Sequence, residues 1–471
     1  INAALPGDTI LVAAGLYNIT KPASEHADIL VNKDDLTLRA MNPAATLADP
    51  WNHSEASIIV ASGNATDVVN ITADGVTFDG FTVSGEGANV NGINISDFCN
   101  NCVVKNNHIT NCSCGIRAAG GNHNISNNTC IYNGKVGIYI IDESANITIE
   151  DNTCDSNGCG IAIVYSANVT IKDNTCDSNL GGIRIDDSAN VTIEDNICDS
   201  NGYYGISARH SRNVTIEDNT CVYNVEGGIV IGDSANVTIE DNICDSNGFG
   251  IYIVDSANIT TEDNICVSNE KAGIVIEGSA NVTIEDNTCD SNGFGIYLWS
   301  SSGIVIRFNT ISNNTAEDSG VHVGSGCKDI LISFNNIYGN SPYGVYNDPS
   351  NPPVDATNNW WGDASGPGPV GPGGGDNVSD NVAYEPWLGA PLELPGHHET
   401  LGAGTHTVDA SAEADTKVTL NLTGDTEIYV VRYESQPFPG EPFPDEALGK
   451  WIDIHVSNPD AVEWPIYVEL S

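Results

Sequence analysis

Hydrophobic and polar residues alternate in a pattern that repeats every 22 or 23 residues between positions 145 and 301. The block at residues 235–256 reads ANVTIEDNICDSNGFGIYIVDS, and seven such blocks follow one another. In NVTIE and GIYIV every second residue is apolar, which is the pattern of a β-strand with one buried face. Asn, Asp, Gly and Ser interrupt each strand after a few residues and indicate tight corners. A period this short predicts one solenoid coil per block, because a single block cannot bury its own apolar face.

The repeat predicts a parallel β-helix with about three short strands per coil, in which the strands of successive coils lie about 4.7–4.9 Å apart. The carboxylates Glu240 and Asp241, which follow the first strand of their block, are expected near the surface. The alternation places the following residues of the same block inside the coil: Val237, Ile239, Cys244, Ile251 and Ile253.

Two positions of the repeat are occupied by Asn in nearly every coil. Stacked amide side chains can form hydrogen bonds along such a column, as in other stacked β structures. A polar ligand track is the alternative interpretation, but corner Asn residues explain the columns without a ligand. The first column contains Asn107, Asn128, Asn152, Asn174, Asn196, Asn219, Asn242, Asn264, Asn287, Asn309 and Asn335. The second contains Asn133, Asn157, Asn179, Asn201, Asn224, Asn247, Asn269, Asn292, Asn314 and Asn340.

Changes in composition divide the chain into four predicted regions. Residues 1–57 contain strand and turn patterns without the repeat register and are expected to form an N-terminal β cap. The β-helix is predicted over 58–362, with coils of 22 to 23 residues in its strict part. Residues 363–382 are rich in Gly and Pro and are interpreted as a linker or capping loop. Alternating strands split by turns predict a small β-sandwich over 383–471.

The repeat resembles that of the right-handed parallel β-helix proteins of the pectate-lyase-like superfamily, in the form found in NosD-type periplasmic proteins and archaeal cell-surface proteins. PGDTILVAAGLYNI at residues 6–19 and NNWWGDASGPGP at 358–369 are similar to the opening and closing segments of those surface proteins. The likeness extends over roughly residues 1–390. It implies an all-β fold, a right-handed parallel β-helix followed by the small C-terminal sandwich. It implies little about function, because this fold hosts lyases, hydrolases, adhesins and structural proteins.

The chain is strongly acidic, with 63 Asp and Glu residues against 16 Lys and Arg and a formal net charge of −47. Nucleic-acid phosphates would be repelled, which argues against a nucleic-acid partner. Cations such as Ca²⁺ or Mg²⁺ and basic partners are more compatible with this charge. No apolar run approaches the roughly 20 residues that span a bilayer. The chain begins at Ile1 and contains one Met, so we expect that a secretion signal preceded it and that the protein is extracellular.

One repeat position is occupied by cysteine in eight consecutive coils, with Ile109, Ile311 and Ile337 at the equivalent position of flanking coils. A position that accepts Ile or Cys is expected to face the core, where Cys behaves as a small hydrophobic residue. A ladder of thiols, disulfides between adjacent coils and a metal–thiolate chain are the three interpretations. The column contains Cys130, Cys154, Cys176, Cys198, Cys221, Cys244, Cys266 and Cys289.

Nearly every repeat carries a pair of carboxylates directly after its first strand, whereas the coil at 167–188 has Lys172 and Asp173 there. Rows of carboxylate oxygens favour Ca²⁺, or Mg²⁺ with its water shell, and no other cofactor is expected. A solvated acidic face screened by salt is the alternative. The candidate cation ligands are Glu217, Asp218, Glu240, Asp241, Glu262, Asp263, Glu285 and Asp286.

Asn-x-Ser/Thr sequons occur throughout the chain and suggest an extracellular glycoprotein. Within the repeats, however, an Asn that precedes a strand is also explained by its tolerance of the left-handed backbone conformation. The repeat sequons lie at Asn146, Asn168, Asn190, Asn213, Asn236, Asn258 and Asn281. The scattered candidates for glycosylation are Asn18, Asn52, Asn64, Asn70, Asn94, Asn124, Asn313, Asn377 and Asn421.

A catalytic site would require one unique constellation, whereas the middle of this chain is nearly invariant. The basic cluster Arg209, His210 and Arg212 is either a sugar-binding or catalytic spot or, more simply, a partner for acidic neighbours. The sequence therefore favours a structural, non-enzymatic extracellular protein, a subunit of an archaeal surface layer or sheath that assembles with copies of itself through residues 383–471. A carbohydrate-active β-helix, either an enzyme or a glycan-binding adhesin, is the alternative. A groove with unique aromatic and acidic residues on one face would favour that alternative, whereas a featureless repetitive face packed against copies of itself would favour the structural protein.

Overall fold

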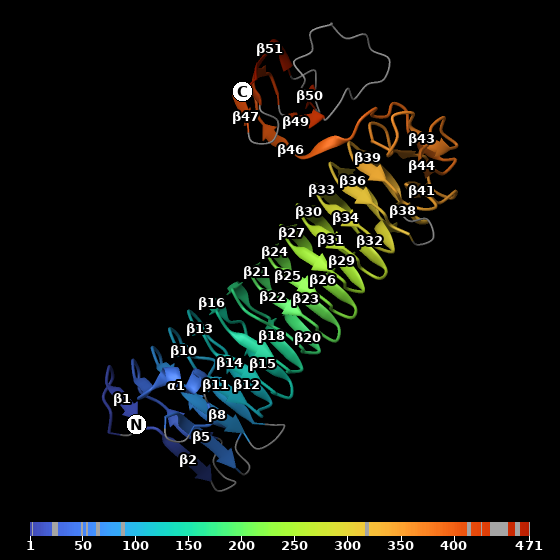
Figure 1. The fold of residues 1–471 in the computed structure, drawn as a ribbon. Coiled ribbons are helices and arrows are strands. Elements are labelled where there is room, and N and C mark those ends of the chain that lie inside the picture. Colours follow the sequence, from blue (N-terminus) through green and yellow to red (C-terminus); the bar gives the residue numbers. More distant parts are fainter. Residues whose placement is uncertain are drawn as a thin grey trace. The chain divides into compact units, whose positions relative to one another are not determined.

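The computed structural model describes residues 1, 3–20, 27–48, 50–52, 55–62, 66–85, 90–315, 320–411, 416–424, 426–433, 451–456 and 462–470. Two compact units divide the chain, residues 1–259 and residues 260–471. In each unit short strands of successive coils pair side by side in parallel, as Figure 1 shows. The predicted parallel β-helix is thereby confirmed.

Three parallel sheets, called A, B and C, form the solenoid, and most coils contribute one strand to each sheet. In the first unit, sheet A has the order β1 (Thr9–Val12), β4 (Thr37–Ala40), β7 (Thr77–Asp79), β10 (Val103–Lys105), β13 (Asn124–Ser126), β16 (Ala145–Glu150), β19 (Ala167–Lys172), β21 (Ala189–Glu194), β24 (Arg212–Glu217) and β27 (Ala235–Glu240). Strand β30 (Ala257–Glu262) contains the boundary between the units. In the second unit, sheet A continues with β33 (Ala280–Glu285), β36 (Ser302–Arg307), β39 (Lys328–Ser333), β42 (Val354–Asp355) and β45 (Val382–Ala383).

Sheet B consists of the shortest strands. In the first unit it contains β2 (Gly15–Thr20), β5 (Ser57–Ser62), β8 (Phe81–Gly85), β11 (His108–Thr110), β14 (Thr129–Ile131) and β17 (Thr153–Asp155), followed after an isolated bridge at Thr175 by β22 (Ile197–Asp199), β25 (Thr220–Val222) and β28 (Ile243–Asp245). In the second unit it contains β31 (Ile265–Val267), β34 (Thr288–Asp290), β37 (Thr310–Ser312) and β40 (Asn336–Tyr338).

Sheet C completes each coil. In the first unit its order is β3 (Ala27–Val31), β6 (Asp67–Ile71), β9 (Asn91–Ile95), β12 (Cys114–Ala118), β15 (Val136–Ile140), β18 (Cys159–Val164), β20 (Gly181–Asp186), β23 (Tyr204–Arg209), β26 (Gly227–Gly232) and β29 (Phe249–Val254). In the second unit its order is β32 (Ala272–Glu277), β35 (Phe294–Trp299), β38 (Val321–Val323), β41 (Val345–Asn347), β44 (Gly375–Val378) and β43 (Pro367–Pro369).

The core of the solenoid contains the residues that the alternation placed inside. Of the predicted set, Val237 is 1% exposed, and Ile239, Cys244, Ile251 and Ile253 are fully buried. On the outer side Glu240 is half-buried and Asp241 is exposed. The predicted strand register is therefore confirmed at the coil that was used to derive it.

The two Asn columns line the inside of the corners and are buried. Asn152 illustrates the first column: its backbone N–H and its side-chain amide both donate to Oδ1 of Asn174, each at 3.0 Å. The predicted bonding along the columns is confirmed. The first column extends beyond Asn335 to Asn359, whose Oδ1 accepts two hydrogen bonds from Asn335.

The segments at both ends of the repeats are built into the sheets. The expected N-terminal cap instead supplies strands of all three sheets: β1 pairs with β4, β2 with β5 and β3 with β6 in parallel register. The short helix α1 (Pro43–Ala48) follows β4. The Gly/Pro-rich segment, expected as a linker or capping loop, forms β43, β44 and part of β45 and contributes to the last coil. Among the described residues no helix is long and apolar enough to cross a membrane.

The C-terminal region changes from parallel to antiparallel pairing. One sheet has the order β46 (Leu392–Leu401), β49 (Thr426–Tyr433) and β50 (Trp451–Val456), and the other has the order β47 (Gly404–Ala410), β48 (Thr416–Leu422) and β51 (Val462–Leu470). Leu401, Ile428 and Val430 of the first sheet share a buried cluster with Val408 and Val418 of the second. The small β-sandwich that the alternating strands predicted is present.

Candidate functional site

The outer surface of sheet C is the part of the solenoid whose side chains do not repeat. On sheet A the corresponding outward position is Thr in five successive coils, at Thr148, Thr170, Thr192, Thr215 and Thr238. On sheet C of the first unit the row instead reads Asn94, Arg117, Tyr139, Ala162, Arg184, Ser207, Val230 and Tyr252. In the second unit it reads Val275, Tyr297, His322 and Tyr346.

Aromatic side chains gather on sheet C of the second unit, and we call this surface the aromatic face. The rings of Tyr297 and His322 stack with centroids 4.9 Å apart, and those of His322 and Tyr346 stack at 5.0 Å. Phe294 meets His322 edge-on at 5.4 Å. Such contacts between neighbouring coils stabilise the face and hold its rings in fixed positions. The aromatic face consists of Phe294, Tyr297, Trp299, His322, Tyr343 and Tyr346.

Trp299 is the member of the aromatic face that is most accessible to a ligand. It ends β35 and its side chain is 40% exposed. Its indole lies over Gly324 of the next coil, where a Cβ atom would come within 2.7 Å of the ring atom Cε3. Because Gly324 has no side chain, the indole can lie close to the backbone of the neighbouring coil. A large apolar ring is thus presented at the surface on a supported position.

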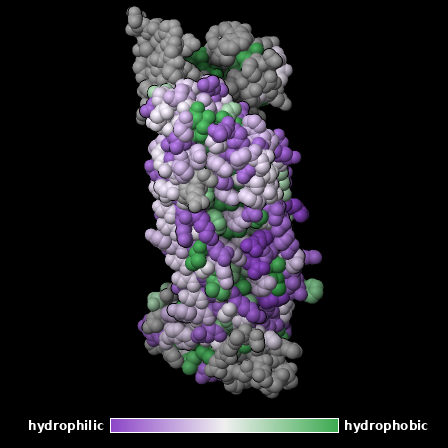
Figure 2. All heavy atoms as spheres, turned by 90° about the vertical axis from the view of Figure 1, so that its right-hand side faces the viewer, coloured by the Kyte–Doolittle hydropathy of each residue, from purple (hydrophilic) through white to green (hydrophobic). Residues whose placement is uncertain are grey.

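Two carboxylates accompany the rings. Glu277 pairs in register with Trp299, and its negative charge adds to the effect of burial in raising the pKa of Tyr297. Asp348 accepts hydrogen bonds from the hydroxyl and the backbone N–H of Ser350, which lower the pKa of that carboxyl. The aromatic face therefore combines rings with hydrogen-bond acceptors. Figure 2 shows that on one side of the molecule hydrophilic side chains predominate and hydrophobic ones form small separate clusters.

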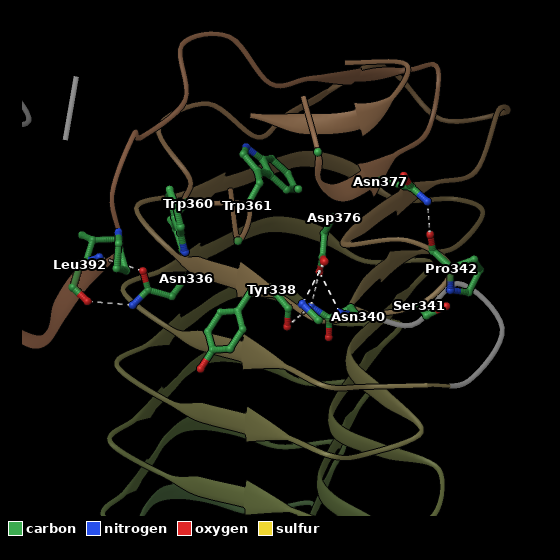
Figure 3. Close-up of a pocket in the computed structure, with 15 residues that line it drawn as sticks. Asn336, Tyr338, Asn340, Ser341, Pro342, Trp360, Trp361, Asp376, Asn377 and Leu392 are labelled. Carbon is green, nitrogen blue, oxygen red and sulfur yellow. Dashed lines mark hydrogen bonds between the residues drawn. The ribbon is translucent and has the colours of Figure 1, made fainter. Parts of the chain in front are cut away.

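An open cavity of about 760 Å³, the terminal pocket, lies at the last coils of the second unit (Figure 3). Four segments line it: residues 336–342, the tryptophans 360–361 with Gly362, residues 374–377, and Pro391 with Leu392. Tyr338 is 38% exposed, and Trp360 is half-buried. Rings and polar groups thus converge on one cavity.

Asp376 ends the second Asn column at this pocket. Its carboxylate accepts hydrogen bonds from the backbone N–H groups of Gly339 and Asn340, each at 2.9 Å, and from the side-chain amide of Asn340 at 2.8 Å (Figure 3). Burial raises the pKa of this carboxyl. The column Asn314–Asn340 is therefore continued by a carboxylate in place of the amide of earlier coils.

Neither the aromatic face nor the terminal pocket was identified from the sequence. Both depend on coils beyond the strict repeat, which ends at residue 301, and residues of neighbouring coils that are 22 or more positions apart come together in them. The signal that could have indicated them is the concentration of Phe, Tyr, Trp and His after residue 293, in a chain whose repeats are otherwise poor in these residues.

The predicted acidic ladder occupies the ends of the sheet A strands. Glu194, Glu217 and Glu240 are register neighbours in successive coils. The Asp that follows each Glu turns the corner with a left-handed backbone, with φ of 56° at Asp218 and 55° at Asp241, a conformation that Asp tolerates better than most residues. No group of three or more potential ligands gathers among the described residues in an arrangement that could hold a metal ion. Ca²⁺ or Mg²⁺ binding by this ladder stays a prediction.

The stacked glutamates make a prediction about stability and pH. Burial and the charges of Glu194 and Glu240 raise the pKa of Glu217. A carboxyl whose pKa is higher in the folded than in the unfolded state destabilises the fold at neutral pH, and this cost disappears as the pH falls through the folded pKa. We expect Glu217→Gln to increase the free energy of unfolding at pH 7 by about 0.2–0.5 kcal/mol and to have no effect near pH 4. Thermal denaturation at both pH values measures this, with the exposed Glu226→Gln as control; a loss of stability at pH 7 would contradict it.

The cysteine column lies inside the coils, as predicted. All eight side chains are fully buried, and Cys130 pairs in register with Cys154, Cys198 with Cys221 and Cys266 with Cys289. The flanking Ile109 and Ile311 occupy the same position. The structure contains all 14 cysteines as buried thiols, and burial raises the pKa of Cys130 and, to about 12, that of Cys159. Hydrogen bonds with Cys130 and Cys176 instead lower the pKa of Cys154, so neighbouring thiols of the column differ in acidity. The stacked, buried arrangement is compatible with the thiol ladder, and the redox state of the column stays a prediction.

The Asn residues of the repeat sequons, from Asn146 to Asn281, have a left-handed backbone conformation with φ between 53° and 58°. This is the conformation by which the sequence analysis explained these Asn residues without glycosylation. Their exposed amides form a third ladder, in which Asn168 donates to Asn146 and Asn190 to Asn168. Among the scattered candidates Asn18, Asn313 and Asn421 are exposed, Asn52, Asn70, Asn124 and Asn377 are half-buried, and Asn64 lies outside the described residues. Asn94 is buried and donates its amide hydrogen to Asn70, which disfavours glycan attachment there. Glycosylation of the other sites stays a prediction.

The basic cluster lies among acidic and aromatic neighbours in the first unit. His210 is 3.6 Å from Asp233, and the guanidinium of Arg209 lies 5.9 Å from the ring centre of Tyr204. Arg212 replaces the Ala of the coils on either side. The interpretation of His210 as a partner for an acidic neighbour agrees with this geometry.

Comparison with known proteins shows which family the fold belongs to. A sequence profile described as the right handed beta helix region matches residues 52–179, 91–243, 177–311 and 227–382. The pre-mature gene product 12 of bacteriophage phi29 is 15% identical, with a TM-score of 0.51 over 80% of this chain and 54% of that one. The A-module of the Azotobacter vinelandii mannuronan C-5 epimerase AlgE6 is 15% identical, with a TM-score of 0.45 over 71% of this chain and 91% of that one. The catalytic domain of a GH87 α-1,3-glucanase is 14% identical, with a TM-score of 0.45 over 72% and 68%. Comparison with curated protein sequences gives no match.

Proposed function

Because the chain belongs to the right-handed β-helix family, with matches spanning residues 52–382, we propose that it is a carbohydrate-binding β-helix protein that holds a glycan chain on the aromatic face. The likeness to solved structures concerns the fold alone. The proposal rests on one observation, the cluster of aromatic and acidic side chains on sheet C of the second unit, with Trp299 exposed at its edge. The sequence analysis expected unique aromatic and acidic residues of this kind, in a groove, for a carbohydrate-active protein.

Exposed aromatic rings beside hydrogen-bond acceptors suit sugars, because a sugar has apolar C–H faces and polar hydroxyl edges. Trp299 supplies the ring, and Glu277 and Asp348 supply acceptors for hydroxyl groups. We propose binding without catalysis. An extracellular location, assembly with other copies and a place in a surface layer or sheath remain predictions from the sequence.

The test is the binding of soluble polysaccharides to the full chain, measured by affinity electrophoresis and isothermal titration. We expect Trp299→Ala to weaken binding at least about tenfold, because removal of the most accessible aromatic ring of the site costs more than about 1.4 kcal/mol. Trp51→Ala is the matched control, since Trp51 is similarly exposed, at 44% against 40%, but lies in the first unit. Equal binding by the two variants, or no binding of any polysaccharide by the unmodified protein, would refute the proposal.

A further inference from the structure

The terminal pocket is separate from the aromatic face and has its own supply of recognition groups. Tyr338 and Trp360 present aromatic rings, and Asn336, Asn377 and Ser341 present polar side chains around the cavity (Figure 3). Its volume of about 760 Å³ lies within the range of small-molecule sites. Rings beside amides and hydroxyls are suited to a polyhydroxylated ligand with apolar faces.

Hydrogen bonds hold the walls of the pocket in place. Asn336 donates to the carbonyl of Leu392 and accepts from its N–H, both at 2.9 Å. Asn377 donates to the carbonyl of Pro342 at 2.8 Å, and Asp376 fixes residues 339 and 340 (Figure 3). These bonds join three of the four lining segments to one another. A preformed site binds with a smaller entropic cost than one that must be ordered.

Charge selects the class of ligand. Among the described residues that line the pocket, Asp376 is the only charged one, and none is Lys or Arg. Its carboxylate already accepts three hydrogen bonds from residues 339 and 340. With a formal net charge of −47 on the chain, an anionic ligand would be repelled without a compensating cation. Uronates and sulfated or phosphorylated sugars are therefore disfavoured.

Trp361 forms part of the wall of the same pocket, and its side chain is fully buried.

We propose that the terminal pocket is a second saccharide site that binds a short, uncharged sugar, such as the end of a neutral glycan. The proposal depends on the proposed function for the class of ligand, a carbohydrate, but it places that ligand at a different site. The aromatic face holds an extended chain, whereas the cavity holds one or two sugar units. Tyr338 and Trp360 are the rings against which the sugar packs.

The experiment titrates the full chain with neutral mono- and disaccharides and with a uronate disaccharide of equal size, followed calorimetrically. We expect the neutral sugars to bind the unmodified protein and Trp299→Ala equally, Tyr338→Ala to bind at least about tenfold more weakly, and the uronate to bind more weakly than the neutral sugars. Tyr203→Ala, at another exposed tyrosine, is the control. Trp360→Phe is the second variant: it retains an aromatic ring but presents a smaller surface for the sugar to pack against, and it should weaken binding.

The outcomes separate the two proposals. If Trp299→Ala loses polysaccharide binding and the unmodified protein binds no short sugar, the proposal for the terminal pocket is refuted and the proposal for the aromatic face stands. Short-sugar binding that is unchanged in both Tyr338→Ala and Trp360→Phe, or uronate binding as tight as neutral binding, also refutes the pocket proposal. If Tyr338→Ala loses short-sugar binding and no variant binds polysaccharide, the proposal for the pocket is supported and the proposal for the aromatic face is refuted.

Discussion

Replacing Ile239 with Asp should destabilise the first unit by about 3–5 kcal/mol, the cost of an uncompensated charge in a dry core. Ile239 is fully buried in β27, where it pairs in register with Ile216 of the preceding coil. The small carboxylate also leaves part of the volume of the Ile side chain empty. Because each coil contacts only its neighbours, the defect interrupts the stack locally. Urea denaturation followed by circular dichroism, with hydrogen exchange to locate the loss, measures the effect.

The matched control for this substitution is Thr238→Asp. Thr238 is the adjacent residue of the same strand and lies half-buried on the outer face. Thr238→Asp introduces the same charge in the same coil as Ile239→Asp, so the two variants have the same net charge. We expect it to cost less than about 1 kcal/mol, within the range of β-strand preferences. Equal destabilisation by both variants would mean that the inside and outside of this strand have been interchanged.

The sequence predicted the features of this protein that repeat. The burial of Val237 and Ile251, the inward cysteines and the Asn columns all follow from the period, because each coil places the same residue in the same environment. The strand alternation also predicted the sandwich strands of the C-terminal region. Local pattern is sufficient where the neighbours of a residue are copies of itself.

The parts that the sequence did not reveal are those in which unlike residues meet. Tyr297 and His322 stack across coils at a spacing of 25 residues, and Asp376 meets Asn340 at a spacing of 36. No periodicity links these pairs, so only the three-dimensional arrangement identifies them. The N-terminal segment was expected to cap the solenoid because it lacks the repeat register, yet backbone pairing between β3 and β6 does not require repeated side chains.

The buried Asn columns should be nearly as sensitive as the apolar core, and Asn219→Ala tests this. The Oδ1 atom of Asn219 accepts hydrogen bonds from the backbone N–H of Asn196 at 2.9 Å and from its side-chain amide at 3.0 Å. The amide of Asn219 donates to the carbonyls of Ile193 and Glu217 at 2.9 and 2.8 Å and to Oδ1 of Asn242 at 3.0 Å. Alanine supplies none of these groups, so buried donors and acceptors in three successive coils lose partners. At about 1–3 kcal/mol for each group left unsatisfied, we expect a loss of about 2–5 kcal/mol in the free energy of unfolding.

A substitution in the exposed Asn ladder separates this effect from the general loss of an amide. Asn213 donates to Asn190 at 3.0 Å on the surface and has a φ of 53°, which glycine adopts readily. Asn213→Gly therefore removes one amide from a ladder without backbone strain and without leaving a buried group unpaired, because water replaces the lost partner. We expect it to change the stability by less than about 0.5 kcal/mol. If denaturation showed similar costs for Asn219→Ala and Asn213→Gly, the columns would contribute through corner geometry. A large difference assigns the stability to hydrogen bonds that only a stacked solenoid can form, since each amide has its partners in the coils before and after its own.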